Sequence, residues 1–400
     1  MAHYKHLVIG GGMTGHAAVQ AIRKADPDGT IGLFSMEPDK PYRRPPLTKG
    51  LWTGQKFDTI WYNTDELGVD MRLSSRVASI DPPNKRIVEA VGDEHTYEKL
   101  LLATGGTPRR LPFGDDDINY YRTVEDYRRL REDAETGRRF IVIGGGFIGS
   151  EIAAALAMNG KEVVMLFPEP GIGWRVFPAG LSQNLNDYYR EKGVELLTGN
   201  TVAGVERSGE EFVLTAQAED GGERREVVVD GIVAGLGIVP NVELAQAGGL
   251  QVENGVVVDE MLRTTAPDVF AAGDVAAFFN PALGGRLRVE HEDNAKAMGR
   301  TAGQNMAGQE TPYHYLPFFY SDLFDLGYEA VGELDSRLET VSHWQEPFRK
   351  GVVYYLREGR VRGVLLWNLW KQLDAARRLI AEPGPFTPDD LKGRLPEAKA

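Results

Sequence analysis

Two glycine-rich motifs are the residues of this 400-residue chain whose spacing most directly suggests chemistry. The first reads GGGMTG and the second GGGFIG, so both match GxGxxG. In such a motif the first glycine makes a tight turn, the second lets backbone approach a pyrophosphate, and the third permits close helix–strand packing. We therefore predict two dinucleotide sites, one at Gly10, Gly12 and Gly15 and the other at Gly144, Gly146 and Gly149.

The segments around the motifs fit this interpretation. An apolar run precedes each motif and an alanine-rich helical pattern follows it, and strand-like runs then come at Thr30–Ser35 and Glu162–Phe167. A single GxGxxG is a weak sign, but two copies between a strand and a helix are far more specific. The chain thus contains two βαβ beginnings, each with a helix N-terminus that can hold a diphosphate.

The chain contains no cysteine. This excludes a redox-active disulfide, cysteine-ligated iron–sulfur clusters and cysteine zinc sites within these residues. Any redox chemistry must therefore reside on a bound cofactor, and we expect no metal site.

Composition and charge narrow the class of protein. The hydrophobic fraction of 42% and charged fraction of 26% are those of an ordinary globular protein, and the length suits two or three domains. The net charge of −13 disfavours binding to nucleic acid or anionic membranes. No apolar stretch approaches the roughly 18 residues of a membrane helix, and the first residues do not resemble a signal peptide. We expect a cytoplasmic protein.

The last ninety or so residues differ from the rest of the chain in composition and pattern. From about Tyr313 the chain is rich in aromatic residues, and Gly351–Arg357 and Val361–Trp367 alternate around Glu358-Gly359 as in a β-hairpin. A helical pattern follows over Lys371–Ile380. These patterns predict a separate C-terminal α+β domain.

The order of the motifs resembles a known family. GxGxxG, PYxRPPLxK, ATGxxPR, GGGFIGSE, GLGxxPN and AGD follow one another as in the FAD-dependent pyridine-nucleotide oxidoreductases, in the branch of ferredoxin and rubredoxin reductases and apoptosis-inducing factor. The resemblance spans roughly Lys5 to Ile380. The segments closest to apoptosis-inducing factor are Arg288–Asn294, Phe319–Asp322, Gly327–Ala330 and Leu366–Asn368.

The resemblance implies an α/β, glutathione-reductase-like architecture with two Rossmann-like domains. A discontinuous FAD domain at 1–112 and 239–312 would surround an NAD domain at 113–238, and an α+β domain would cover 313–400. Hydride would pass from the nicotinamide to the flavin.

For FAD, the resemblance implies a set of binding residues beyond the first glycine motif. Met36 stands where the family has an acid for the adenosine ribose, so we expect Glu37 to take that contact; an ordinary solvated glutamate is the alternative. The other FAD contacts implied are Arg44, Thr104, Gly105, Arg109 and Asp274.

Lys49 and Glu151 are the expected catalytic pair. The resemblance places Lys49 near flavin N5, with Glu151 as its partner, where a positive charge would stabilise electron density added on reduction. The alternative is that both are solvated helix residues, the usual fate of Lys and Glu.

For the nicotinamide dinucleotide, the resemblance implies several residues beyond the second glycine motif. Phe147 would cover the flavin, or else pack in the core, and Gly237 would lie near the nicotinamide end. Glu169 follows the second strand and could accept the adenosine 2′-hydroxyl, which favours NADH over NADPH. Arg175 instead favours NADPH, since an arginine could accommodate a 2′-phosphate.

Four further positions follow from the branch that includes apoptosis-inducing factor. Glu290 and His291 would open a helix whose N-terminus stabilises the anionic reduced flavin. His291, Tyr320 and Glu329 match nicotinamide contacts in that branch.

Three functions remain open from the sequence. The first is reduction of a ferredoxin, a rubredoxin or a similar one-electron carrier by NADH. The second is slow NADH sensing, as in apoptosis-inducing factor, and the third is reduction of quinones or other small acceptors. Either a monomer or a homodimer is expected.

Overall fold

The computed structural model describes residues 1–114 and 117–395. The chain divides into two compact units, each built from three segments. Unit 1 comprises Met1–Arg44, Asp58–Thr107 and Val239–Phe318, and unit 2 comprises Pro45–Phe57, Pro108–Ile238 and Phe319–Ala400. Residues 45–57 therefore group with unit 2, and so does the expected C-terminal domain. The three-domain division remains a prediction.

Unit 1 is built on the first βαβ segment. Its main sheet has the strand order β3-β2-β1-β6-β5-β4, with β19 beside β6. These strands are β1 (Ala2–Ile9), β2 (Ile31–Phe34), β3 (Asp70–Arg72), β4 (Val77–Asp81), β5 (Arg86–Glu89), β6 (Glu94–Leu102) and β19 (Val269–Ala271). β1 pairs in parallel with both β2 and β6, so Val8 lies between Leu33 and Leu101, and all three are fully buried. The predicted strand Thr30–Ser35 is confirmed as β2.

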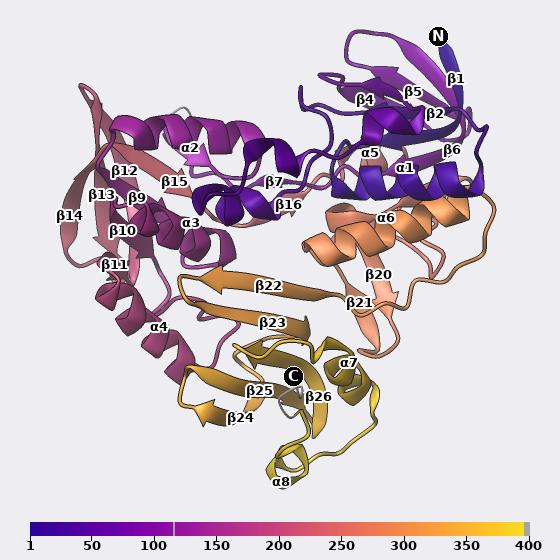
Figure 1. Cartoon of the computed structure of the whole chain (residues 1–400). Helices are drawn as coiled ribbons and strands as arrows, with labels where there is room; N and C mark the ends of the chain where they lie inside the picture. Colours follow the sequence, from indigo (N-terminus) through magenta and orange to yellow (C-terminus); the bar gives the residue numbers. More distant parts are fainter. Residues whose placement is uncertain (115–116, 396–400) are drawn as a thin grey trace. The chain divides into compact units, whose positions relative to one another are not determined.

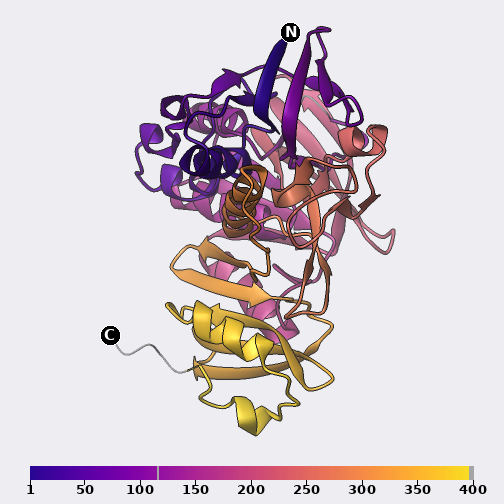
Figure 2. The ribbon, with the colours of Figure 1, turned by 90° about the vertical axis from the view of Figure 1, so that its right-hand side faces the viewer.

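Helices α1 (Met13–Ala25) and α6 (Glu292–Met306) lie side by side in unit 1 (Figures 1 and 2). Two glycines of α6 make this close approach possible. A Cβ at Gly299 would lie 2.4 Å from the carbonyl oxygen of Thr14, and one at Gly303 would lie 2.4 Å from that of Ala18. The α6 backbone therefore packs directly on α1, the helix that follows the first glycine motif.

Smaller elements complete unit 1. A second sheet has the order β17-β18-β20-β21, formed by Val252–Glu253, Gly255–Val257, Ala276–Asn280 and Gly285–Leu287. α5 spans Glu243–Ala247, and the 3-10 helices η4 and η5 span Thr64–Leu67 and Gly273–Val275; η3 (Phe57–Ile60) begins at the last residue of the unit 2 segment 45–57.

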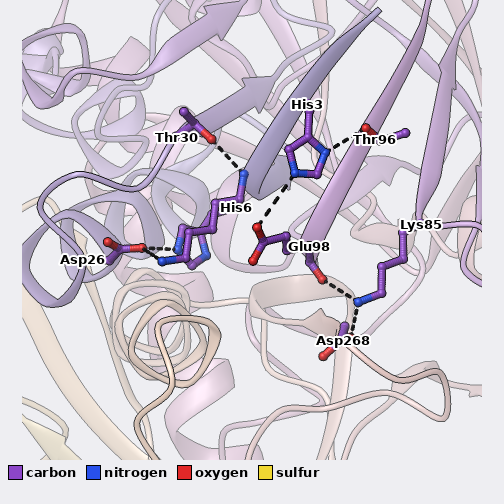
Figure 3. A network of polar contacts seen from close by, with 9 residues as sticks. His3, His6, Asp26, Thr30, Lys85, Thr96, Glu98 and Asp268 are labelled. Atoms are coloured by element: carbon purple, nitrogen blue, oxygen red, sulfur yellow. Dashed lines mark hydrogen bonds and ion pairs between the residues drawn. The ribbon is translucent and has the colours of Figure 1, made fainter.

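A polar network fastens the start of β1 to neighbouring segments (Figure 3). Asp26, just after α1, accepts from Lys5 Nζ at 2.8 Å and lies 2.9 Å from His6 Nε2. The Thr96 hydroxyl on β6 lies 2.9 Å from His3 Nδ1. Asp268, just before β19, pairs with Lys85, which also donates to the Glu98 carbonyl. These contacts link β1 to β6 and to the turn after α1.

Unit 2 contains the second βαβ segment. Its main sheet has the order β11-β10-β9-β15-β8, and its pairs are parallel. The strands are β8 (Ile118–Tyr120), β9 (Arg139–Ile143), β10 (Glu162–Phe167), β11 (Val194–Thr198) and β15 (Gly231–Ala234). The helices are α2 (Val124–Thr136), α3 (Phe147–Met158) and α4 (Ala179–Glu191). The predicted strand Glu162–Phe167 is confirmed as β10.

An antiparallel meander, β12-β13-β14, follows within this part of the chain and covers Asn200–Ser208, Glu211–Ala218 and Arg224–Val229. The short strands β7 (Gly106–Pro108) and β16 (Ile238–Pro240) lie where the chain passes from one unit to the other.

Residues 45–57 form the 3-10 helices η1 (Pro45–Thr48) and η2 (Gly50–Trp52), and they are hydrogen-bonded to residues next to β8 and α3 in unit 2. The Tyr121 hydroxyl donates to the Leu47 carbonyl at 2.6 Å, and Asn159 Nδ2 donates to the Trp52 carbonyl at 3.0 Å. These bonds explain why this short segment belongs to unit 2.

The C-terminal part of unit 2 is an antiparallel sheet of order β22-β23-β26-β25-β24. Its strands are β22 (Phe318–Leu323), β23 (Leu326–Gly332), β24 (Glu339–Glu346), β25 (Lys350–Arg357) and β26 (Arg360–Trp367). The predicted hairpin is confirmed as β25–β26. The predicted helix is confirmed as α7 (Leu373–Ala381), which packs on β23 and β26 (Figure 2), and α8 (Pro388–Leu391) follows.

Candidate functional site

The backbone of unit 1 forces two positions of the first glycine motif to be glycine. Gly10 has φ of +124°, and a Cβ there would lie 2.0 Å from the Ala103 carbonyl oxygen. A Cβ at Gly15 would lie 2.1 Å from the Gly10 carbonyl oxygen. These two glycines allow β1, β6 and α1 to meet closely.

Gly12 has a different environment. Gly12 is the N-cap of α1 and makes no side-chain capping hydrogen bond in the described structure. The first turn of α1 contains no acidic residue. No described heavy atom lies within 4 Å of a Cβ built at Gly12. Open space at a helix N-terminus with free N–H groups fits an anionic diphosphate, so the residues present fit FAD.

Glu37 and Arg44 form an ion pair in unit 1. Arg44 donates to Glu37 Oε1 at 2.6 Å, and the Tyr42 hydroxyl donates to Glu37 Oε2 at 2.6 Å. The Arg44 guanidinium also lies 5.3 Å from the centre of the Tyr42 ring. Met36 is 71% exposed and makes no such contact in the described structure. The carboxylate in this turn is thus oriented, and its contact with a ribose stays a prediction.

The ATG and PN segments bond to each other within unit 1. The Thr104 hydroxyl donates to the Asn241 carbonyl at 2.8 Å, and the Asn241 side chain donates back to the Thr104 carbonyl at 2.9 Å. The Asn241 N–H donates to the Gly105 carbonyl at 3.0 Å. In unit 2, the Arg109 N–H donates to the Gly237 carbonyl at 2.9 Å.

Asp274 and the start of α6 supply the remaining predicted residues of unit 1. Asp274 lies in η5, directly after β19, and its carbonyl accepts from Arg288 at 3.1 Å. Arg288 also pairs with Glu290 at 2.6 Å. His291 is the N-cap of α6, where burial lowers its pKa to about 4 against the opposing effect of the Asp274 charge. The imidazole is therefore neutral at pH 7.

The second glycine motif in unit 2 repeats the geometry of the first. Gly144 has φ of +112°, with the Gly235 carbonyl oxygen 2.5 Å from a built Cβ. Gly149 would place a Cβ 2.0 Å from the Gly144 carbonyl oxygen. Gly146, the N-cap of α3, has no described heavy atom within 4 Å of a Cβ. The start of α3 therefore also fits a diphosphate.

Glu169 and Arg175 are held together after β10. Glu169 Oε1 accepts from Arg175 Nε at 2.8 Å and from its terminal nitrogen at 2.7 Å. The arginine side chain is 83% exposed, whereas Glu169 is 23% exposed. Glu169, which favours NADH, and Arg175, which favours NADPH, thus form one ion pair.

Lys49 and Glu151 form a buried ion pair, with Lys49 Nζ 2.6 Å from Glu151 Oε1. Their side chains are only 15% and 4% exposed, so neither is a solvated surface charge. The ring centre of Tyr320, from the C-terminal sheet, lies 5.2 Å from Lys49 Nζ. The structure brings these predicted residues together, while their part in catalysis stays a prediction.

Glu329 has a buried carboxylate oxygen, Oε2, with no hydrogen-bond partner among the described residues. Burial raises the pKa of this carboxyl, although the charge of Arg377 and a backbone hydrogen bond from Lys371 oppose the shift. An unsatisfied buried acceptor such as Glu329 Oε2 suits a ligand with N–H donors, for example a nicotinamide carboxamide.

Phe147, at the start of α3, contacts Phe319 with ring centres 5.2 Å apart.

Two hydroxyl groups in contact with Glu151 escaped the sequence analysis. Thr48 Oγ1 donates to Glu151 Oε2, and Ser321 Oγ donates to Glu151 Oε1. Thr48 lies within the PYxRPPLxK motif, directly before Lys49, which was the one available signal. Ser321 lies 170 positions from Glu151, within the segment Phe319–Asp322 that resembles apoptosis-inducing factor, but no local pattern indicates its contact with Glu151.

Comparisons with known proteins identify the family. The model of the pyridine nucleotide-disulphide oxidoreductase family matches residues 4–299. The chain belongs to this family. The model of the C-terminal domain of apoptosis-inducing factor, mitochondrion-associated, matches residues 302–347 and 343–382. The predicted family and fold class are confirmed.

Relatives match along nearly the full chain. Apoptosis-inducing factor 1, mitochondrial, of Dictyostelium discoideum is 35% identical over 94% of this chain and 78% of its own length. The ferredoxin–NAD(+) reductase component of the anthranilate 1,2-dioxygenase system of Burkholderia cepacia is 33% identical, with 96% of both chains covered. The reductase of a covalent putidaredoxin reductase–putidaredoxin complex superposes with a TM-score of 0.89 at 28% identity, covering 98% of both chains.

Family membership makes this protein an FAD-dependent NAD(P)H oxidoreductase, as predicted, in which electrons pass from the pyridine nucleotide to the flavin. In the described part of the chain, no cluster of three or more His, Asp or Glu side chains could hold a metal ion. None of the described helices combines the length and the apolar character needed to cross a membrane.

Proposed function

We propose that this protein passes electrons from NADH through its flavin to a ferredoxin- or rubredoxin-type carrier protein. The likeness over 96% of both chains to a reductase that is named for its ferredoxin partner carries this proposal. The absence of cysteine from these 400 residues supports it, because no internal disulfide can receive the electrons here. The electrons must then leave the flavin for an external acceptor.

The residues of the protein would bind, orient and stabilise the cofactors. The N-terminus of α1 at Gly12 would hold the FAD diphosphate, and that of α3 at Gly146 would hold the nucleotide diphosphate. Bound FAD supplies the ability to accept a hydride and release electrons singly. Lys49, held by Glu151, would supply the positive charge that favours the electron-rich reduced ring.

Glu169 supports NADH over NADPH as the donor. Its carboxylate can accept from a 2′-hydroxyl, whereas it would repel a 2′-phosphate. Arg175 is bound to the same carboxylate, which offsets its attraction for phosphate. Stopped-flow measurement of flavin reduction by NADH and by NADPH tests this assignment. Glu169→Gln should reduce the ratio of the NADH rate constant to the NADPH rate constant. Faster reduction by NADPH in the parent protein would contradict the assignment.

The acceptor is tested by steady-state turnover of the FAD-loaded protein with NADH. Ferricyanide and a ferredoxin or rubredoxin from the same cell should raise turnover well above the rate with oxygen alone. Glutathione disulfide should not be reduced. Failure of every carrier and every one-electron acceptor would contradict the proposed function.

A second function has a specific observation in its favour. The C-terminal domain model of apoptosis-inducing factor matches residues 302–347 and 343–382, which favours a slow NADH-sensing flavoprotein. The same assays separate the two functions. A long-lived reduced complex with NADH, together with failure of carriers and quinones, would support this second function. Rapid reduction of quinones alone would instead indicate a small-acceptor reductase.

A further inference from the structure

The Glu151 carboxylate is held by two hydroxyl groups in addition to Lys49. Its Oε1 accepts from Lys49 Nζ at 2.6 Å and from Ser321 Oγ at 2.5 Å. Its Oε2 accepts from Thr48 Oγ1 at 2.6 Å. Each carboxylate oxygen therefore has its own hydroxyl donor, so the group cannot rotate without breaking a bond.

These hydroxyls are buried and committed to Glu151. Ser321 is 1% exposed and Thr48 is 6% exposed, so water does not compete for them. A hydroxyl has one proton to donate. The Thr48 oxygen also lies 3.3 Å from the Pro45 carbonyl, but its contact with Glu151 is much shorter. Short hydrogen bonds to a charged oxygen are the strong, orienting kind.

The two donors come from separate parts of unit 2. Thr48 ends η1, and Lys49 is the next residue. Ser321 lies on β22, the edge strand of the C-terminal sheet, next to the Tyr320 ring that faces Lys49 Nζ. Glu151 lies in the second turn of α3, after the second glycine motif. The C-terminal sheet thus contacts both members of the ion pair through consecutive residues.

We propose that Thr48 and Ser321 are positioning residues for Lys49. They fix the Glu151 carboxylate, and Glu151 Oε1 then holds Lys49 Nζ at one place. The inference rests on the proposed function, in which the Lys49 charge favours the reduced flavin. Without either hydroxyl the carboxylate can turn, and a shift of about 1 Å in a charged group can cost up to about 100-fold in rate.

Three substitutions and a matched control test this inference in the FAD-loaded protein. Thr48→Val and Ser321→Ala remove one hydroxyl each with little change in shape, whereas Thr48→Ser retains the hydroxyl. Thr123→Val is the control, because it removes the α2 capping hydroxyl of the same unit, which bonds to Asp126 rather than to Glu151. It reports the effect of lost stability alone.

The first readout is flavin reduction by NADH in stopped flow. Thr48→Val and Ser321→Ala should each lower the limiting rate constant about tenfold, while the dissociation constant of NADH stays within about twofold. The flavin midpoint potential should become more negative in both variants. Thr48→Ser and Thr123→Val should retain the parent rate and potential.

The second readout does not depend on electron transfer. Acylation of Lys49 by an N-hydroxysuccinimide ester is followed by peptide mass spectrometry, with Lys99, which pairs with Asp268, as internal reference. Thr48→Val and Ser321→Ala should speed labelling of Lys49 relative to Lys99, and the control should not. Unchanged labelling in both variants, or faster labelling with parent rates and potentials, would overturn the inference. A parent flavin that neither NADH nor NADPH reduces would refute the proposed function, while labelling would still decide whether Lys49 is positioned.

Discussion

The Glu151 carboxylate would destabilise the fold if it were buried without partners, but three donors compensate its charge. Its carboxylate is almost fully buried on α3 and receives one ammonium and two hydroxyl donors. Removing a single partner from a buried ion pair leaves an uncompensated charge, which destabilises a protein far more than loss of an exposed pair. Lys49 and Glu151 are therefore expected to act as a unit in both stability and catalysis.

A double-mutant cycle on this pair tests that expectation. Lys49→Met should lower the free energy of unfolding by about 3 kcal/mol, because it leaves Glu151 buried and unpaired. Adding Glu151→Gln should restore part of the loss, giving a coupling energy of about 1–2 kcal/mol. Effects on flavin reduction should be non-additive in the same way. Denaturant titration and stopped flow measure both, and additive effects would return both residues to independent roles.

Gly12 is a glycine whose substitution should affect the ligand rather than the fold. Because a Cβ there meets no described heavy atom, Gly12→Ala should leave the free energy of unfolding of the apoprotein within about 1 kcal/mol. It should nevertheless weaken FAD retention, since the side chain enters the space of the diphosphate. Flavin absorbance after gel filtration measures retention. Gly204→Ala, at another open glycine, is the control, and equal retention in both variants would contradict the FAD assignment.

Helices α1 and α6 pack against each other through direct backbone contacts. Their contact is made by glycine in α6 against backbone carbonyls in α1, so the neighbouring atoms cannot turn away as a side chain could. Since α1 carries the proposed FAD diphosphate site at its N-terminus, this packing also supports the cofactor.

Gly303→Ala should therefore destabilise unit 1. The added Cβ would lie 2.4 Å from the Ala18 carbonyl oxygen, and overpacking of this kind costs about 1–3 kcal/mol. Gly285→Ala is the matched control in the same unit, because its nearest neighbour is 3.9 Å away. Chemical denaturation of the apoprotein compares the two. Equal stability would show that α6 can move away from α1 at no cost.

The turn after α1 gives a prediction with a pH signature. Hydrogen bonds from Lys5, and then from His6, lower the pKa of Asp26 to about 2. A carboxyl whose pKa is lower in the folded state stabilises the protein above its unfolded pKa of about 3.9. That contribution is lost as pH falls from about 4 to about 2.

Asp26→Asn should therefore lower stability by about 1 kcal/mol at pH 7, a modest value because the site is partly solvated. The difference from the parent protein should shrink between about pH 4 and pH 2. Urea titrations across this range measure it. A constant difference at all pH values would mean that the contact contributes through packing rather than charge.

For the molecule as a whole, cofactor binding should contribute to stability. A ligand that binds only the folded chain stabilises it by about 2.7 kcal/mol at a concentration 100 times its dissociation constant. Adding FAD to apoprotein should therefore raise the thermal midpoint. Riboflavin, which lacks the diphosphate that the α1 N-terminus is proposed to hold, should raise it far less. Equal gains from both compounds would contradict the proposed diphosphate site.

Much of this architecture could be predicted from local sequence because its determinants are local. A GxGxxG turn needs glycine where the backbone has positive φ or meets another strand, as Gly10 and Gly144 show. Alternating apolar residues around Glu358-Gly359 similarly specify the β25–β26 hairpin. The family motifs also identified Lys49 and Glu151, although only a resemblance linked two residues 102 positions apart.

Tertiary structure alone decided which groups satisfy the buried charges. Ser321 donates to Glu151 because β22 lies beside α3, and nothing in the neighbouring residues of either element specifies that contact. The ion pair of Glu169 and Arg175, by contrast, is a local contact between opposite charges six positions apart in the loop after β10. Residue periodicity records which face of an element is buried, but not which element covers it. The sequence by itself therefore determined the two dinucleotide folds and the cysteine-free chemistry, while the packed chain determined how the ion pair is held.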